Sequence, residues 1–382
     1  MLIGIQYNSS RGGPPFRRMT PSMLNRIALI DAYLRDHGGQ VFVYSPGDID
    51  LDAPDVPGYF FEAGEVTETR QPPPRVNGNW TNKTRRMLES GIGYEAFERW
   101  IEERRLEVCV PHAFSELVGN KLETYRLIRG FHETLHPHCE PYRHARKQLE
   151  RFIESGPITF IKPNKGSKGD KILTLRRKEE GLFLTHYQKG KRRTRKVRDA
   201  AAAETLIHER IGGRRTHIIQ EGVETMRHQG SAFDIRVVML HDGDSWGWLH
   251  EARVSPEGSD VSNVYQGGAI TITDELLFDL LGPEQARQAS YELKSESFGL
   301  AGYLERLHPG RLHEVAFDFV LDSDGQLRLL EINTKPGMSG IGSEVTIFDK
   351  RPEHEPLFER WVYPQTRRLA RFLLLRHQRL QS

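Results

Sequence analysis

Two neighbouring segments near residue 330 carry oxygen ligands at a spacing that suits a metal ion. Glu331 and Asn333 are two residues apart in LLEIN, so on a strand their side chains share one face. Just upstream, EVAFDFVLD predicts a second strand that carries Asp318, and the intervening DSDG predicts a turn. Mg²⁺ prefers a few carboxylate or amide oxygens together with phosphate oxygens and water. The three residues therefore predict a magnesium site.

The alternative interpretation is a surface strand pair whose acidic side chains are solvated. Leu329, Leu330 and Ile332 surround Glu331 in the sequence. A strand this apolar is at least half buried, and burying an unpaired carboxylate is costly. The neighbours of Glu331 therefore favour the metal site over the solvated pair.

A lysine inside an apolar strand precedes a glycine-rich turn in FIKPNKGSKGDKI, residues 160–172. Burying Lys162 is costly unless a charged partner meets it. The turn with Gly166, Ser167 and Gly169 lets backbone N–H groups approach phosphate oxygens, and the lysine supplies a positive charge. The segment matches neither the Walker A pattern nor G-x-G-x-x-G. An ordinary hairpin turn, with a lysine that reaches out to solvent, is the alternative.

Two arginines and an asparagine lie between these segments. In FDIRVVM, Asp234 and Arg236 alternate along a strand, so both are expected on the same side of it. Arg253 ends a later strand, and Asn263 precedes a glycine turn. A structural ion pair and plain loop chemistry are the alternatives for these residues. Beside a phosphate loop and a metal site, they become candidates for stabilising charge on a transferred phosphoryl group.

The composition of the 382-residue chain excludes several classes of protein. A net charge of +2 gives no global sign of binding to nucleic acid or to a membrane. Two cysteines are too few for a disulfide framework and suit a reducing cytosol, so we expect a cytoplasmic location. No signal peptide and no apolar run of about 18 residues is found. The basic run 189–198 predicts a solvated face, with capture of a polyanion as the alternative.

The elements that must position these residues fall into successive parts. LIGIQY, the helix that starts at PSMLNRIALIDAYL and QVFVYSP predict a β-α-β unit with a parallel strand pair. From about residue 118 two helices are expected, followed by strands and hairpins. Residues 231–333 predict mostly strands with one helical interval around 283–306, and the tail predicts an amphipathic helix.

The order of these segments resembles the ATP-grasp superfamily over about residues 116–345. Among its members the chain looks most similar to the YheC/YheD-type proteins associated with the spore coat. The resemblance rests on GNKLETYRLI, IKPNKGSKGDKI, IIQEGV, FDIRVVM, SNVYQGG and LLEINTKPG. It implies an α/β protein with an N-terminal α/β domain at 1–115 and a two-lobed ATP-grasp domain whose antiparallel sheets clamp the nucleotide. A small lid would cover about 155–225, and the helical segment 346–382 would pack on the ATP-grasp domain.

The resemblance implies ATP and Mg²⁺ as cofactors and assigns residues to the nucleotide. The residues implied to bind it are Lys121, Lys162, Gly166, Ser167, Gly169, Gln220, Glu221 and Val223. The two lysines would contact the α- and β-phosphates, and the turn 164–169 would close over them. The remaining three would form the adenine hinge, with Glu224 or a nearby acid on the ribose.

The same resemblance assigns the metal and the reacting groups. It gives Asp318, Glu331 and Asn333 to Mg²⁺ between the β- and γ-phosphates. It gives catalytic roles beside the γ-phosphate and the acyl substrate to Arg236, Arg253 and Asn263.

The implied reaction is an ADP-forming ligation that makes a C–N bond. A carboxylate would attack the γ-phosphorus to give an acylphosphate, and an amine would then displace phosphate. The alternatives are a phosphotransferase that acts on a hydroxyl, and a nucleotide-binding coat or scaffold protein without activity. The expected partners are a small-molecule or peptide carboxylate and an amine acceptor, without a membrane or nucleic acid. A homodimer is one option for the oligomeric state.

Overall fold

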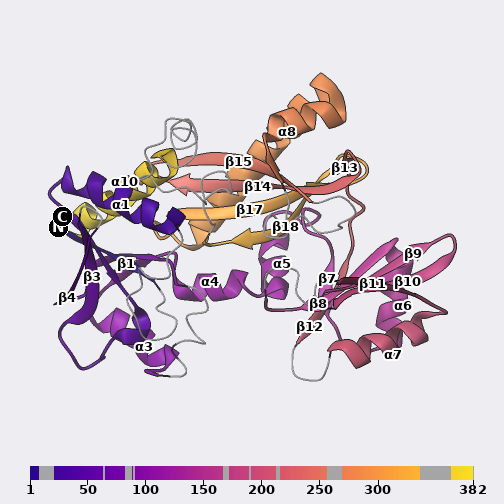
Figure 1. Ribbon diagram of the computed structural model, residues 1–382, viewed down its shortest axis with the longest axis horizontal. Coiled ribbons are helices and arrows are strands. Elements are labelled where there is room, and N and C mark those ends of the chain that lie inside the picture. The colour runs from indigo at the N-terminus through magenta and orange to yellow at the C-terminus, as the bar shows by residue number, and fades with distance from the viewer. Residues whose placement is uncertain are drawn as a thin grey trace.

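The structure is a computed structural model that describes residues 1–7, 21–62, 65–81, 88, 91–166, 172–188, 191–211, 216–255, 269–335 and 363–381. The described strands form three sheets. In Figure 1 the N-terminal sheet lies at the left, the large sheet runs across the upper middle, and the small sheet lies at the lower right. Among the described helices, none combines the length and the apolar character that a membrane crossing requires.

The N-terminal sheet contains a parallel core, as the β-α-β pattern predicts. Its strand order is β4-β3-β2-β1-β5-β6. Strands β2, β1, β5 and β6 run parallel to one another, and β3 pairs antiparallel with both β2 and β4. The strands are β1 (Leu2–Gln6), β2 (Gln40–Tyr44), β3 (Val56–Glu62), β4 (Glu65–Gln71), β5 (Val76–Asn79) and β6 (Glu107–Cys109). The helices of this part are α1 (Pro21–Arg35), η2 (Pro46–Asp48), α3 (Tyr94–Glu103) and α4 (His112–Val118). Parallel strands bring their carboxyl ends to one edge of the sheet.

The C-terminal helix α10 (Tyr363–Arg379) packs between two parts of the molecule. Its buried Leu369, Phe372 and Leu373 share one hydrophobic core with β1 and α1. On its other side, Arg368 donates to Asp242 of the β14–β15 turn at 2.8 Å. The helix therefore contacts both the N-terminal part and the large sheet. The sequence predicted only the second of these contacts.

The small sheet is antiparallel throughout, with the order β11-β10-β9-β8-β12-β7. Its strands are β7 (Cys139–Pro141), β8 (Ile158–Pro163), β9 (Leu173–Lys178), β10 (Gly181–Gln188), β11 (Lys191–Val197) and β12 (His217–Glu221). Helices α6 (Arg146–Ser155) and α7 (Ala200–Ile211) share a core with it. The basic run forms the edge strand β11 rather than a tip alone, and the sheet starts at Cys139, upstream of the expected lid.

The large sheet has the order β16-β15-β14-β17-β18, with β13 paired to β14. Its strands are β13 (Arg227–His228), β14 (Ser231–His241), β15 (Trp246–Val254), β16 (Ala269–Thr271), β17 (Glu314–Leu321) and β18 (Leu327–Asn333). Helix α8 (Thr273–Leu307) shares the main hydrophobic core with this sheet. Gly282, at φ 74°, and Pro283 break its path, so the helical interval predicted around 283–306 corresponds to the part after the kink.

Helix α5 (Lys121–Arg129) stands between the two lobes of the ATP-grasp domain. Asn120 caps it by accepting hydrogen bonds from the backbone N–H groups of Leu122 and Glu123. The cap fixes Lys121 at the first helical position, the helix start that the sequence predicts. Two segments cross between the lobes: residues 134–138 lead into β7, and residues 221–226 lead out of β12.

Candidate active site

One face of the large sheet carries a set of polar side chains from four strands, which we call the polar face. The register places Arg236 opposite Asp318, and Asp318 opposite Glu331, in one row across three strands. Asp234 stands opposite Arg253 in the next row. The polar face comprises Asp234, Arg236, Arg253, Asp318, Glu331 and Asn333. The opposite face, with Phe233, Ile235 and Phe317, packs into the core with α8.

A β-bulge in β18 gives Glu331 its place on this face. β17 pairs Asp318 with Glu331 but Phe319 with Leu329, so Leu330 is an extra residue in the ladder. In a regular strand, Leu329 and Glu331 would point the same way. Here Leu329 is fully buried in the core, whereas Leu330 is 37% exposed. The bulge therefore lets the strand bury a leucine and still present the carboxylate.

Two arginines clamp Asp318. Arg236 donates from Nε to Oδ1 at 2.8 Å and from Nη2 to Oδ2 at 2.7 Å, and Nη2 of Arg253 lies 3.1 Å from Oδ2. Nε of Arg253 donates to Asp234 at 2.5 Å. Burial alone would raise the pKa of Asp318, but the two guanidinium groups outweigh burial and hold that pKa below its usual range. Arg236 does form the structural ion pair that was the alternative interpretation; its partner is Asp318 on the neighbouring strand, while Asp234 pairs with Arg253.

Glu331 and Asn333 carry oxygens that accept no hydrogen bond from the described residues. Among the described residues the Glu331 carboxylate has no hydrogen bond or ion pair, and burial followed by repulsion from Asp318 raises its pKa. Asn333 donates from Nδ2 to Asp318 at 3.2 Å, which leaves its Oδ1 as an acceptor. Two carboxylates and an amide oxygen suit Mg²⁺ that is shared with phosphate. Within the described ranges, no cluster of three or more His, Cys, Asp and Glu side chains could hold a metal ion.

Two lysines lie close enough to Glu331 to interact with its carboxylate. Lys162 lies on β8 of the small sheet, and Lys121 starts α5. Burial, and after it the nearby Lys121 ammonium, lower the pKa of Lys162 to about 8, although the Glu331 carboxylate acts in the opposite direction. The pKa of Lys121 is also lowered by burial and raised by Glu331. Because one carboxylate influences both lysines, the three charges lie within electrostatic reach of one another.

The start of the glycine-rich turn, at Asn164 and Gly166, is hydrogen-bonded to the first residue of α5. Lys121 donates from Nζ to the carbonyl of Gly166 at 2.6 Å, and its backbone N–H donates to the carbonyl of Asn164 at 3.0 Å. Gly166 has a φ of 140°, a conformation that glycine adopts at least cost. Three candidates, Ser167, Gly169 and Asn263, lie outside the described residues.

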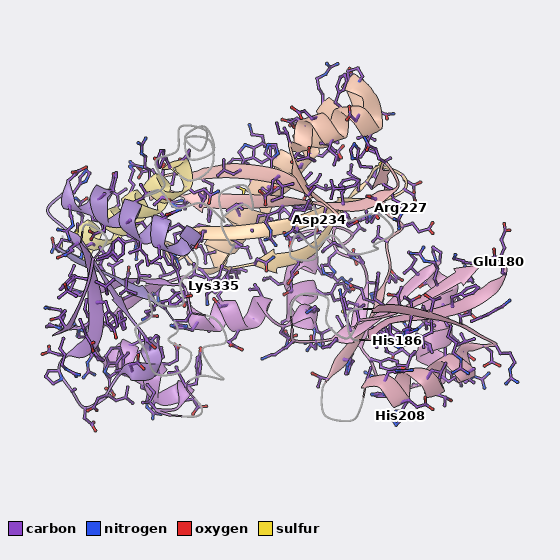
Figure 2. The ribbon with its side chains drawn as sticks, in the orientation of Figure 1. Glu180, His186, His208, Arg227, Asp234 and Lys335 are labelled. Atoms are coloured by element: carbon purple, nitrogen blue, oxygen red, sulfur yellow. The ribbon has the colours of Figure 1, made fainter. Side chains whose placement is uncertain are left out.

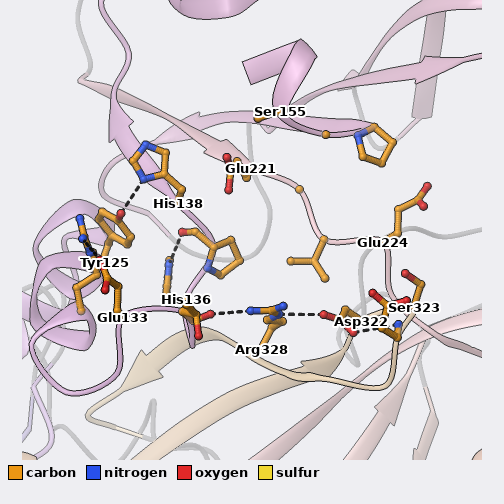
Figure 3. A pocket seen from close by; sticks show the side chains of 18 residues that line it. Tyr125, Glu133, His136, His138, Ser155, Glu221, Glu224, Asp322, Ser323 and Arg328 are labelled. Atoms are coloured by element: carbon orange, nitrogen blue, oxygen red, sulfur yellow. Dashed lines mark hydrogen bonds and ion pairs between the residues drawn. The ribbon is translucent and has the colours of Figure 1, made fainter. Parts of the chain in front are cut away.

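The predicted adenine hinge divides between a buried and a cavity-lining part. Gln220 is buried in β12, whereas Glu221 and Val223 line a cavity of about 800 Å³ between the lobes. Figure 3 shows Glu221 on the upper side of this cavity, and Asp322 and Arg328 on the lower side. Neither the two lysines nor Glu331 is among its lining residues. The cavity therefore lies apart from the place where Lys121, Lys162 and Glu331 come within electrostatic reach of one another.

A hydrogen-bonded relay in this cavity wall escaped the sequence analysis, which treats the histidines of HPHC as loop residues. Tyr125 Oη lies 2.7 Å from Nδ1 of His138, and Nε2 of His138 lies 2.9 Å from Glu140 (Figure 3 shows the first contact). Hydrogen bonds from Arg151 lower the pKa of Glu140 to about 2. An ionised Glu140 accepts, so Nε2 donates to it and Nδ1 accepts from the tyrosine. The signal in the sequence was the spacing of His138 and Glu140, two residues apart at the start of a strand, which places their side chains on the same side.

A second group missed by the sequence analysis joins the N-terminal domain to the large sheet. Arg26 of α1 donates to Glu314 of β17 at 2.7 Å, with both side chains almost fully buried, and its guanidinium lies 4.6 Å from the Trp80 ring centre. Lys335, just beyond β18, donates from Nζ to the carbonyl of Thr81. Burial lowers the pKa of Lys335 to about 8. We call this contact region the seam; apolar spacing in the sequence gave no sign of it.

Comparison with known proteins agrees with this arrangement. A family described as YheC/D like ATP-grasp matches residues 111–350. The relative "Endospore coat-associated protein YheD" from Bacillus subtilis (strain 168) is 23% identical over 312 residues, which is 79% of this chain and 65% of the relative. The chain thus spans slightly less than two thirds of the length of that relative.

Two solved structures share the fold. D-alanyl-alanine synthetase A from Vibrio cholerae O1 biovar eltor str. N16961 has a TM-score of 0.53 at 12% identity, over 98% of each chain. D-cycloserine synthetase DcsG has a TM-score of 0.52 at 12% identity, over 98% of this chain and 99% of that one. At such identities the likeness concerns the fold alone, and it confirms the α/β ATP-grasp architecture that the sequence predicts.

Proposed function

Since the chain belongs to the YheC/D-like ATP-grasp family, we propose that it is an ATP-dependent carboxylate–amine ligase. One observation carries the proposal. Lys162 of the small sheet and Lys121 of α5 lie within electrostatic reach of Glu331, and Asp318 and Asn333 stand beside that carboxylate. Cations on one side and oxygen ligands on the other are what a metal-bound triphosphate needs from its two neighbours.

The nucleotide would lie between the small sheet and the polar face of the large sheet. Lys121 and Lys162 would neutralise the α- and β-phosphates, while the turn that begins at Gly166 closes over them. The backbone around Glu221 and Val223 would bind the adenine edge. We propose 1–115, 116–345 and 346–382 as the domain limits, with β7 added to the lid because it pairs with β12.

Magnesium, when bound by Asp318, Glu331 and Asn333, would neutralise charge on the β- and γ-phosphate oxygens. The side chains of the protein do the remaining work. Arg236 and Arg253 already stand in the row beside these ligands and can stabilise the charge that develops on the transferred phosphoryl group. Among the described residues, Oδ1 of Asp318 accepts from Arg236 alone, so the carboxylate keeps a lone pair for a metal while it holds both arginines. The clamp would thus couple metal binding to the placement of the arginines.

The reaction would run in two steps. A carboxylate oxygen attacks the γ-phosphorus, the bond to the β-phosphate oxygen breaks, and an acylphosphate and ADP result. An amine then attacks the acyl carbon and displaces phosphate, forming an amide. We propose a small molecule or peptide as the carboxylate owner, and the cytoplasm, with its ATP, as the site of the reaction.

The test is incubation with Mg·ATP and a panel of amino acids and acidic peptides, with ADP release and product mass as readouts. We expect ADP together with a product whose mass equals the two substrates minus water. Glu331→Gln should lower ADP release by about 100-fold or more, because a metal ligand and its charge are lost. Normal turnover in that variant would reject the metal assignment. A product heavier by one phosphate, without amide, would make the protein a phosphotransferase instead.

A further inference from the structure

Lys335 lies at the meeting point of two regions that the proposed reaction must bring together. It follows Asn333, the last residue of β18, by two positions and reaches the N-terminal domain through its hydrogen bond to the Thr81 carbonyl. Figure 2 labels it between the N-terminal domain and the large sheet. The lysine is half-buried, and within the part of the chain that the structure describes, a neutral carbonyl is its one hydrogen-bond acceptor.

The carbonyl that holds Lys335 is itself fixed by a chain of buried hydrogen bonds. The backbone N–H and the hydroxyl of Thr81 donate to Oδ1 of Asn79 at 3.1 and 2.6 Å. Nδ2 of Asn79 lies 3.1 Å from Nδ1 of His112, and Nε2 of His112 lies 2.9 Å from Oε1 of Gln6. All four of these residues are almost fully buried. A carbonyl anchored this deeply gives the lysine a defined position.

The same chain of hydrogen bonds follows the carboxyl ends of the parallel strands. Gln6 ends β1, Asn79 ends β5, and His112 opens α4 shortly after β6. Ligands of open α/β sheets bind outside the carboxyl ends of their strands. The N-terminal domain therefore directs its ligand-binding edge toward the end of β18, where the polar face of the large sheet begins.

Among the described side chains around Lys335, the positive charges outnumber the negative ones. Two carboxylates are near enough to raise its pKa, those of Glu116 and Glu314. Glu314 already accepts from Arg26 at 2.7 Å, and Glu116 lies 3.4 Å from Nζ of Lys165. Among the residues that the structure describes, three cations thus share two carboxylates, and Lys335, whose hydrogen-bond acceptor is a carbonyl, is the cation not paired with a carboxylate. A half-buried cation without a matching anion is costly, so an anionic ligand would stabilise it.

We propose that Lys335 binds the carboxylate that is to be phosphorylated, and so selects acidic substrates at the edge of the N-terminal sheet. This inference rests on the proposed ligase function, and it adds a residue and a place for the substrate. The position fits, because Lys335 follows Asn333 by two residues, which span at most about 7 Å of chain, so a carboxylate on Lys335 would lie near a γ-phosphate held at Asn333.

The test is calorimetry with defined probes. Protein is first saturated with Mg·AMP-PNP and then titrated with L-glutamate, succinate or hexa-L-glutamate. We expect at least one probe to bind, and Lys335→Gln to weaken that binding by about tenfold or more through the lost charge. Glutamine keeps an N–H donor for the Thr81 carbonyl, so the seam should still close. Lys335→Arg should restore most of the affinity, and Lys178→Met, an exposed lysine of β9 that serves as the control, should change it by less than about threefold.

The outcomes separate this inference from the function on which it rests. Failure of Mg·AMP-PNP to bind would reject the proposed function, and the same carboxylate titration is then run on nucleotide-free protein. Equal affinity in wild type and Lys335→Gln would overturn the role of the lysine, as would the absence of binding by every probe to wild type. Thermal unfolding of each variant shows whether it is folded. If Lys335→Gln is not, Lys335→Arg decides, since an intact arginine variant that binds no probe also contradicts the proposal.

Discussion

The large sheet has two neighbours, and it meets them in different ways. At the seam with the N-terminal domain, Arg26 and Glu314 are 3% and 2% exposed and form an ion pair, and α10 completes a shared core. At the hinge with the small lobe, two chain segments cross beside a cavity of about 800 Å³. A packed interior transmits force and resists deformation, whereas a cavity leaves room for displacement. The comparison indicates that the N-terminal domain and the large sheet form one unit, relative to which the small lobe can move.

This division separates the two halves of the proposed nucleotide site. Asp318, Glu331 and Asn333 lie on the rigid unit, while Lys162 lies on the lobe that can move. A nucleotide that contacts both halves would close the cleft by its differential affinity for the closed state. The following substitutions would break or sharpen the comparison, from the largest expected effect to the smallest.

Breaking the ion pair at the seam should cost most. Arg26→Met leaves Glu314 buried without its partner, which should lower the free energy of unfolding by about 3–5 kcal/mol. Urea unfolding measures the loss. The control Arg126→Met removes an exposed pair with Glu123 and should cost less than about 1 kcal/mol. Adding Glu314→Met to Arg26→Met should recover part of the loss, because no unpaired charge remains. Equal stability of Arg26→Met and wild type would mean that the seam is not rigid.

The seam should also be sensitive to acid. His313 is fully buried, neither ring nitrogen has a hydrogen-bond partner among the described residues, and burial lowers its pKa from 6.5 to about 4. Between these pH values the unfolded chain binds a proton that the folded chain does not, so the free energy of unfolding should rise with pH from about 4 to about 6.5 and then level.

His313→Leu should flatten that rise by up to about 3 kcal/mol across the window, measured by urea unfolding at each pH. The exposed His37 provides a control, since His37→Asn should leave the slope of the wild type unchanged. An unaltered slope in His313→Leu would show that this histidine is not held neutral by the fold.

At the hinge, a single methyl group should be enough to disturb the lobes. A Cβ on Gly222 would lie 2.4 Å from Cγ2 of Ile158 and 2.9 Å from its carbonyl oxygen. Gly222→Ala should therefore cost about 1–3 kcal/mol of stability and also weaken nucleotide binding, because the hinge must shift. Gly156→Ala, at the same end of the lobe but with open space around it, is the matched control. Similar behaviour of the two variants would show that the hinge tolerates the extra volume.

The smallest effect should come from the relay in the cavity wall. Tyr125→Phe removes the donor to His138 and should lower the free energy of unfolding by about 0.5–1.5 kcal/mol. The exposed Tyr291→Phe should have no measurable effect. A loss from Tyr125→Phe as large as that from Arg26→Met would erase the contrast between seam and hinge.

Parts of the site were predictable because they depend on local spacing. The alternation in LLEIN places Glu331 and Asn333 on one face, and the asparagine before Lys121 starts α5 where expected. The bulge at Leu330 was not predictable, since it is defined by the pairing of β18 with another strand. The partner of Arg236, Asp318 on the neighbouring strand, was not predictable for the same reason.

The contacts of the seam, which escaped the sequence analysis, join distant segments of the chain. Lys335 and Thr81 are 254 residues apart, and Arg26 and Glu314 are 288 apart. Neither pair leaves a mark in local composition. Only the three-dimensional arrangement of the domains shows that these charges meet.

The most direct test of the central claim is the affinity for Mg·AMP-PNP, measured by calorimetry in wild type and in Lys162→Met. Lys178→Met, an exposed lysine on the same sheet, serves as the control. If the small lobe and the large sheet hold the triphosphate between them, Lys162→Met should bind about tenfold more weakly or worse, and Lys178→Met should bind as wild type does. Undiminished affinity in Lys162→Met would contradict a nucleotide held between Lys162 and Glu331.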